Sequence, residues 1–157
     1  MDFFMKTIIT YGTFDLFHVG HIRLLKRLKE LGDRLIVGIS SDSFNSIKGK
    51  KSFFSYEERA EIVLSCKYVD LVFPENNWEQ KESDILKYNA NIFAIGDDWK
   101  GKFDYLKPLC DVIYLPRTEN ISTTDIKKQL SNISKDDLKK IETYLSQVNE
   151  IILAISR

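Results

Sequence analysis

Short apolar runs alternate with stretches of helical spacing along most of the chain. Five runs rich in β-branched and aromatic residues predict strands, over 7–11, 35–39, 68–73, 92–95 and 111–115. Between and after them, polar-apolar patterns and capping signals predict helices over 18–31, 55–66 and 78–88 and another beginning near 122. Alternating strands and helices indicate βα units. We therefore expect one α/β domain with a five-stranded, mostly parallel sheet flanked by helices.

Residues with strong capping or chain-breaking preferences mark the ends of these elements. Pro74 and Pro116 follow the third and fifth predicted strands, where proline is expected to stop them. Ser55 and Glu58 form a capping-box pattern that opens a helix. Ser122 is a second N-cap candidate. The residues between the second strand and the capped helix include a loop over 48–52.

The pattern changes after residue 131. Six apolar residues recur there at 3-4-3-4-3 spacing, which predicts an amphipathic helix with a heptad-type seam: Leu138, Ile141, Leu145, Val148, Ile152 and Ile155. We expect a domain over 1–131 and a C-terminal helical extension over 132–157. The seam has to be buried, and two options stay open. It packs on the flank of its own domain, or it packs against a second subunit.

Composition excludes several classes of protein. The chain has 157 residues, 43% of them hydrophobic, as expected for a globular domain with a real core. Lys plus Arg equals Asp plus Glu, 23 against 23, so a whole-molecule basic field for nucleic acid is absent. Cys66 and Cys110 have neither paired spacing nor a secretory signal. The apolar run over 151–155 is too short to span a bilayer. We expect a cytoplasmic protein with no nucleic-acid or membrane partner.

Both histidines of the chain lie where the first strand gives way to the first helix. His18 and His21 are three residues apart in the first helical turn, so both imidazoles project from one face at the positive end of the helix dipole. Side-chain donors beside unpaired backbone N–H groups favour an anion such as a nucleotide phosphate. Two ordinary histidines, one exposed and one packed, are the plainer interpretation. A zinc site is disfavoured because no third ligand is nearby, and we expect no protein-held metal.

Three further segments follow predicted strands, at the sheet edge where ligands bind in parallel sheets. Residues 47–51 hold three lysines, which also suit a solvated loop. Residues 96–99, G-D-D-W, offer carboxylates for a base, a ribose or a metal. Residues 117–124 place Arg117 before a cluster of hydroxyls at a second helix start, a set suited to a polyphosphate.

The chemistry indicated is transfer between two phosphorylated groups. The sequence contains neither the P-loop nor the G-x-G-x-x-G fingerprint, and no G-x-S-x-G or Cys beside a His that would mark a nucleophile. An attacking phosphate needs no base, because its second pKa is about 6. An enzyme of this kind gathers two repelling anions and stabilises charge on the phosphorus, a task suited to lysine, arginine, histidine and helix ends.

With these motifs in order, the chain resembles the cytidylyltransferases of the nucleotidyltransferase superfamily defined by an H-x-G-H signature. It is most similar to the branch whose acceptor is glycerol 3-phosphate. H-V-G-H at 18–21 specifies only the superfamily; the ordered set is more specific. It includes Y-G-T-F-D at 11–15, K-x-K-K at 48–51, S-Y-E-x-R at 55–59, N-W-E-Q-K at 77–81, G-D-D-W at 96–99 and P-R-T-E-x-I-S-T-T at 116–124.

The resemblance implies a Rossmann-like fold and a reaction of CTP with glycerol 3-phosphate that gives CDP-glycerol and pyrophosphate, for teichoic-acid or capsular polymers. Mg²⁺ would be carried on the CTP phosphates. His18, His21, Lys48 and Arg117 would be catalytic, Asp15, Lys48 and Lys81 would bind the acceptor, and Arg59 would support the charge network. The CTP contacts implied are Thr13, Phe14, His18, His21, Lys50, Asp98, Arg117, Thr118, Glu119, Asn120, Ile121, Ser122, Thr123 and Thr124. The related enzymes are dimers, so a homodimer is expected.

Three departures from the family pattern stand out. Asn120 takes the place of the usual glycine, and asparagine tolerates left-handed backbone better than most residues. Lys67 takes a place often held by arginine, which keeps charge but loses bidentate geometry. The tail after residue 131 exceeds the short family enzymes. Two rival functions remain: a transferase of the same fold with another phosphorylated acceptor or ATP, and a nucleotide-binding module without catalysis.

Overall fold

The computed structural model describes residues 4–119, 121–132 and 135–156. Contacts between residues group the chain into two compact units, Met1–Thr123 and Thr124–Arg157. The first unit holds the sheet and is described first. The predicted boundary at residue 131 stays a prediction.

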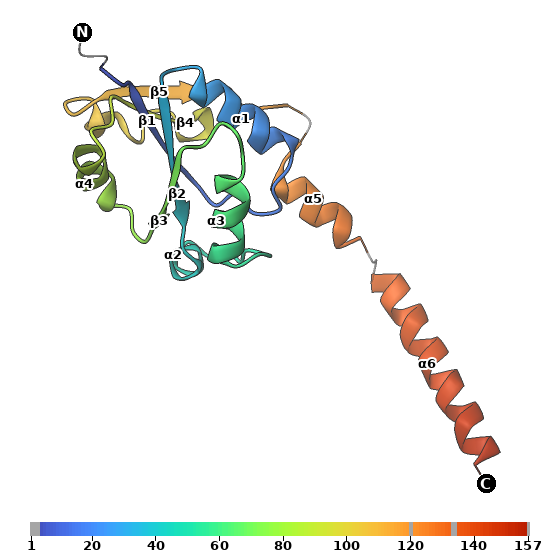
Figure 1. Ribbon diagram of the computed structural model, residues 1–157. Coiled ribbons are helices and arrows are strands. Elements are labelled where there is room, and N and C mark those ends of the chain that lie inside the picture. The colour runs from blue at the N-terminus through green and yellow to red at the C-terminus, as the bar shows by residue number, and fades with distance from the viewer. Residues whose placement is uncertain (1–3, 120, 133–134, 157) are drawn as a thin grey trace. The chain divides into compact units, whose positions relative to one another are not determined.

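Five parallel strands form the single sheet of the described first unit (Figure 1). They are β1 (Thr7–Gly12), β2 (Arg34–Ser40), β3 (Leu71–Glu75), β4 (Ile92–Gly96) and β5 (Asp111–Leu115). The strand order is β3-β2-β1-β4-β5, and every ladder is parallel. The predicted α/β fold with a five-stranded sheet is confirmed, and the sheet is entirely parallel.

Helices cover both faces of this sheet (Figure 1). One face carries α1 (Val19–Lys29) and α3 (Tyr56–Leu64), and the other carries α4 (Gln80–Lys87). Successive strand residues point to opposite faces, so Ile8 joins the core under α1 and α3 while Ile9 joins the core under α4. Short elements complete the unit: α2 (Asp42–Ile47) and the 3₁₀ turns Asp97–Trp99 and Asp104–Leu106.

Local sequence signals account for several element ends. The Ser55 capping box is confirmed: Ser55 Oγ accepts from the Glu58 N–H at 3.3 Å, and Glu58 Oε2 accepts from the Ser55 N–H at 2.9 Å. The prediction that Pro74 stops the third strand is wrong. Pro74 lies inside β3, paired with Ile39. Because β3 is an edge strand, the missing N–H of proline leaves no neighbouring strand unpaired.

The second unit contains helix α5 (Thr123–Leu130), apart from its first residue, and helix α6 (Lys135–Ile155). The structure confirms a long helix over the predicted seam. At about 1.5 Å per residue, its 21 residues make a rod of about 31 Å. The packing of the seam stays a prediction. None of the helices in the described part of the chain is apolar enough over a sufficient length to cross a bilayer.

Candidate active site

The predicted site residues follow the carboxyl ends of all five strands. The strand order reverses between β1 and β4, and ligands of open α/β sheets bind at such a reversal, outside the carboxyl ends. The turn with both histidines follows β1 at this position, and α1 begins there. The sheet topology therefore places the predicted phosphate-binding turn where a ligand is expected.

The turn between β1 and α1 is strained and well anchored. Phe14 and Leu16 adopt left-handed backbone with φ of 52° and 48°, which costs of order 1–3 kcal/mol per non-glycine residue. Between them, the Asp15 carboxylate is buried and accepts hydrogen bonds from the backbone N–H groups of Phe53 (2.7 Å) and Phe54 (3.1 Å). Asp15, predicted to bind substrate, thus ties the turn to the end of the lysine-bearing loop.

Each histidine uses one ring nitrogen to cap the helix. His18 is the N-cap, and its Nδ1 accepts from the Gly20 N–H at 3.0 Å, while His21 Nδ1 accepts from the His18 N–H at 3.2 Å. Backbone N–H groups expected to be unpaired are thus satisfied by the imidazoles themselves. Since both Nδ1 atoms accept, both Nε2 atoms carry the proton of the neutral ring. The rings stack with centroids 3.9 Å apart.

Burial keeps these imidazoles neutral. Desolvation lowers the pKa of His21 to about 4, helped by the nearby His18 and opposed by Asp15. Desolvation also lowers the pKa of His18. At neutral pH the pair therefore offers two Nε2–H donors without adding positive charge. Thr123 Oγ lies 3.4 Å from His18 Nε2, and because this hydroxyl donates to the Asp15 carbonyl at 2.9 Å, it accepts from His18.

Glycine is required at position 20 because neighbouring side chains leave no room for a Cβ atom. A Cβ at this position would lie 2.7 Å from His18 Cε1 and 2.9 Å from Ile121 Cγ2. A side chain would therefore push the His18 ring off the helix end or displace the segment before α5. The glycine of the H-x-G-H pattern lets both histidines and the Ile121 segment meet at one helix terminus.

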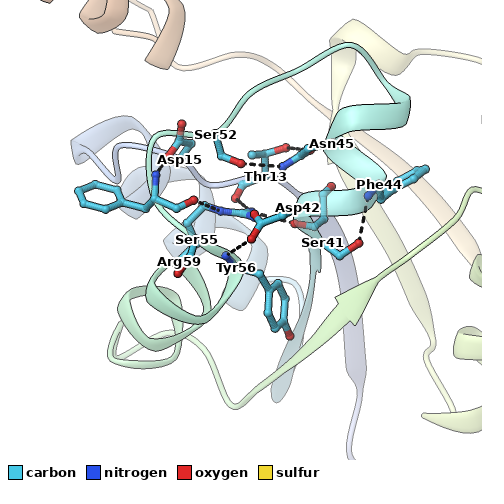
Figure 2. Close-up of polar contacts among 12 residues, drawn as sticks. Thr13, Asp15, Ser41, Asp42, Phe44, Asn45, Ser52, Ser55, Tyr56 and Arg59 are labelled. Carbon is cyan, nitrogen blue, oxygen red and sulfur yellow. Dashed lines mark hydrogen bonds and ion pairs between the residues drawn. The ribbon is translucent and has the colours of Figure 1, made fainter.

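Arg59 joins the loops around the site (Figure 2). Its guanidinium is fully buried and donates to the backbone carbonyls of Phe54, Thr13 and Ser40 at 3.1, 2.8 and 2.9 Å. Nη2 also pairs with the Asp42 carboxylate at 2.7 Å. One side chain of α3 thus connects the ends of β1 and β2 with α2 and the loop after it, in line with its expected role in the charge network.

A second set of bonds orders the same loops. Thr13 Oγ donates to Asn45 Oδ1 at 3.0 Å, and Asn45 Nδ2 donates to Ser52 Oγ at 3.2 Å, as Figure 2 shows. Gly49 turns the loop with a φ of +69°, and the exposed Lys50 donates its backbone N–H to the Asn45 carbonyl at 2.8 Å. The Lys50 side chain is left at the surface of a positioned loop.

Lys48 is half-buried and lies over the ring of Phe44, with Nζ 4.4 Å from its centroid. Its Nζ donates to Ser40 Oγ at 2.8 Å. Desolvation lowers the pKa of Lys48 to about 8; Glu75 opposes this change, and Lys50, Lys81 and Arg59 add to it.

Lys81 lies deeper, at 1% exposure, and its Nζ pairs with Glu75 Oε1 at 2.6 Å. The same ammonium lies over the rings of Tyr11 and Trp78, at 4.5 and 5.0 Å from their centroids. Trp78 also lies 5.6 Å from Lys48 Nζ. The two lysines predicted to bind the acceptor are therefore brought together at one aromatic ring.

The other predicted residues lie near the ends of β4 and β5. Asp98 is exposed in the 3₁₀ turn after β4. Arg117 and Glu119 are exposed, whereas Thr118, Ile121 and Ser122 are half-buried. Thr123 and Thr124 begin α5. Asn120 lies outside the described residues. Lys67, the other departure, has Nζ 5.1 Å from the Tyr68 ring centroid.

Four residues that bind the predicted site residues were not themselves predicted: Ser40, Asp42, Asn45 and Glu75. A sequence signal for α2 was present and was missed: Ser41 is a favourable N-cap residue, and the acidic Asp42 follows it in the first turn. The roles of Ser40 and Glu75 depend on the register that sets them opposite each other on β2 and β3. Among the described residues, no group of three or more His, Cys, Asp or Glu side chains is arranged to hold a metal ion.

Comparison with known proteins gives this arrangement a family. The cytidylyltransferase-like family model matches residues 9–129. The chain is 58% identical to the glycerol-3-phosphate cytidylyltransferase of Bacillus subtilis, over 82% of this chain and 100% of that protein. It is 57% identical to the enzyme of that name from Staphylococcus aureus, over 80% and 96%.

A crystal structure supports the same fold. The lipopolysaccharide core biosynthesis protein from Thermoplasma volcanium superposes with a TM-score of 0.65 at 25% identity, covering 73% of this chain and 99% of that one. Together with the ordered motifs and the capped histidine pair, these matches show that the chain belongs to the cytidylyltransferase-like family.

Proposed function

We propose that this protein transfers CMP from CTP to glycerol 3-phosphate, giving CDP-glycerol and pyrophosphate. The observation that carries the proposal is the match with glycerol-3-phosphate cytidylyltransferases at 57–61% identity over nearly their full lengths. The site supports it independently, because two neutral histidine donors, the half-buried Lys48 and the buried Lys81 follow neighbouring strands. An acceptor oxygen forms a bond to the α-phosphorus of CTP, and the bond from that phosphorus to the β-phosphate oxygen breaks, releasing pyrophosphate.

The residues divide into donors for the reacting phosphate and cations for the two substrates. His18 and His21 present Nε2–H donors at the start of α1, suited to the charge that develops on the transferred group. Lys48 and Lys81 bind the acceptor phosphate. Lys50 and Arg117, both exposed, bind the triphosphate. Because the acceptor phosphate is already ionised at neutral pH, no side chain has to remove a proton from it.

The site suits a magnesium ion that is bound mainly by the phosphates of the nucleotide. Mg²⁺ is commonly held by one or two carboxylates together with substrate phosphates and water. The described residues contain no three-ligand cluster, and the exposed Asp98 after β4 offers one carboxylate on the nucleotide side. We propose that Mg²⁺ arrives with CTP and neutralises part of its charge.

The protein is proposed to act as a homodimer in the cytoplasm, with its product used for teichoic-acid or capsular polymers. The seam of α6 supports self-association, because six apolar side chains repeat along one face of a 21-residue helix. The free thiols of Cys66 and Cys110 support a reducing compartment.

The experiment is a pyrophosphate-release assay over a matrix of four nucleoside triphosphates and several phosphorylated polyols. We expect release from CTP only with acceptor present, and fastest with glycerol 3-phosphate. A preference for ATP or another polyol phosphate would replace the assigned substrates, and release without acceptor would contradict transfer. Calorimetry adds a second check: Arg117→Ala should weaken CTP binding, whereas Lys81→Ala should leave it nearly unchanged.

A further inference from the structure

A continuous hydrogen-bonded chain connects the two acceptor lysines through β2 and β3. Lys81 Nζ donates to Glu75 Oε1 at 2.6 Å, Ser40 Oγ donates to Glu75 Oε2 at 2.9 Å, and Lys48 Nζ donates to Ser40 Oγ at 2.8 Å. Ser40 and Glu75 are paired in the β2–β3 register, so the backbone fixes the two central members. The ammonium groups are therefore placed by the sheet as well as by their own flexible side chains.

Burial makes this connection costly to break. Ser40, Glu75 and Lys81 are exposed by 0%, 2% and 1%. A buried ammonium needs a partner that offsets its lost hydration, and the Glu75 carboxylate is that partner for Lys81. Glu75 uses its second oxygen on Ser40, so one carboxylate organises both lysines. The Trp78 ring lies near both ammonium groups, 5.6 Å from Lys48 Nζ and 5.0 Å from Lys81 Nζ.

We propose that Glu75 and Ser40 are positioning residues of the acceptor site, which fix the placement of the Lys48 and Lys81 ammonium groups for binding the phosphate of glycerol 3-phosphate. This inference rests on the proposed function. Glu75 itself carries no positive charge and does not contact the acceptor phosphate. Its effect is transmitted through the two lysines.

The charges around Lys48 define what the network does to its titration. Glu75 on β3 favours the protonated ammonium, and Lys50 in the loop, Lys81 on α4 and Arg59 on α3 disfavour it. Of these four charged groups, Glu75 alone raises the pKa of Lys48, and the three cationic groups lower it. Replacing it with neutral glutamine should lower the pKa of Lys48 further below its already reduced value, so Lys48 loses its proton at lower pH.

The test compares Glu75→Gln and Ser40→Ala with the wild type and with Ser46→Ala. Ser46 is a matched control on α2, exposed, with its hydroxyl on the Asp42 carbonyl at 3.1 Å. Glu75→Gln should raise KM for glycerol 3-phosphate roughly tenfold and move the alkaline limb of kcat/KM about one pH unit lower. KM for CTP should stay within about twofold. Ser40→Ala, which keeps the Glu75–Lys81 pair, should change both quantities in the same direction by less.

A labelling experiment reads Lys48 without relying on turnover. The rate of its amine acylation against pH, followed by mass spectrometry, gives the apparent pKa of Lys48 in the folded protein. Lower values in Glu75→Gln and in Ser40→Ala support the network, even if the acceptor differs from glycerol 3-phosphate. Unchanged Lys48 titration in both folded variants would overturn the inference. So would equal weakening of CTP and acceptor use, which indicates general structural damage. Wild-type inactivity with CTP and glycerol 3-phosphate would contradict the proposed function instead.

Discussion

Replacing Arg59 with methionine should be among the most destabilising single changes in the first unit. The guanidinium is fully buried and bonds three backbone carbonyls and the Asp42 carboxylate. Methionine fills much of the volume but donates nothing. Each buried polar group left unsatisfied costs about 1–3 kcal/mol. Asp42 is 54% exposed and regains water, so the loss comes mainly from the carbonyls of Thr13, Ser40 and Phe54.

The expected sum is about 4 kcal/mol, within the 3–5 kcal/mol typical of breaking a buried charge interaction. For a chain of this size, about 2–4 °C of melting temperature is lost per kcal/mol, so Arg59→Met should melt about 10 °C lower. Urea unfolding followed by circular dichroism measures the free energy directly. The free energy of unfolding of Arg59→Lys should lie between those of the wild type and Arg59→Met, because lysine keeps the charge but not the planar set of guanidinium donors.

Arg23→Met is the matched control, since Arg23 is exposed on α1 and its replacement should change stability by less than about 0.5 kcal/mol. If Arg59→Met unfolded at the same urea concentration as Arg23→Met, the carbonyls would be satisfied in another way. The role of Arg59 as the connection between β1, β2 and α2 would then be wrong.

Three further predictions concern the histidines and the tail. His18→Ala and His21→Ala should each lower kcat on the order of 10²–10³-fold with little change in KM for CTP, measured by steady-state pyrophosphate release; near-normal kcat would make the histidines structural. Because burial lowers the pKa of His21 to about 4, its contribution to stability is complete above the unfolded value of about 6.5 and is lost as pH falls toward 4. Urea midpoints between pH 7 and 4 should therefore fall more steeply for the wild type than for His21→Gln, and parallel curves would contradict the neutral buried ring. Leu145→Glu with Val148→Glu should destabilise α6 by several kcal/mol while activity per folded molecule persists. Light scattering and melting curves distinguish a lost dimer from an intact dimer of lower melting temperature, and no change in either would mean that the seam is not buried.

Local signals were sufficient for the parts of the fold that depend on near neighbours in sequence. Strand propensity predicted β1, β2, β4 and β5 to within a residue or two, and the Ser55 capping box predicted the start of α3. The prediction that Pro74 ends the third strand was wrong because proline is tolerated inside an edge strand. Whether a strand lies at an edge depends on the order of strands in the sheet, which the local sequence does not show. The six-residue α2 is too short to show helical periodicity, and its start depends on a single cap, Ser41.

The site, like the fold, has some features that the sequence predicts and others that depend on contacts between distant residues. The position of His18 and His21 at a strand-to-helix turn was visible in sequence, but their use of Nδ1 as helix caps was not. That geometry leaves the Nε2–H donors for other partners, and it depends on backbone dihedrals. Asp15 was identified as a site residue, yet its bonds to Phe53 and Phe54 join positions 38 and 39 residues apart. Contacts of this range follow from the fold and have no local pattern.

The electrostatic organisation of the site follows a division between buried and exposed cations. Arg59 and Lys81 are buried: Arg59 donates to backbone carbonyls that shape the loops, and Lys81 pairs with the Glu75 carboxylate, which holds its ammonium in place. Lys50 and Arg117, which we propose bind CTP, are exposed at the surface and hydrated, so a phosphate can replace water at these groups. Because the two histidines are neutral, the hydrogen bonds that we propose they donate to the reacting phosphate add no positive charge to the site. The chain has no net charge, yet the buried cations Arg59 and Lys81 are each held by a carboxylate, Asp42 and Glu75, near the carboxyl ends of the strands. This local arrangement is what the proposed binding of two anionic substrates depends on.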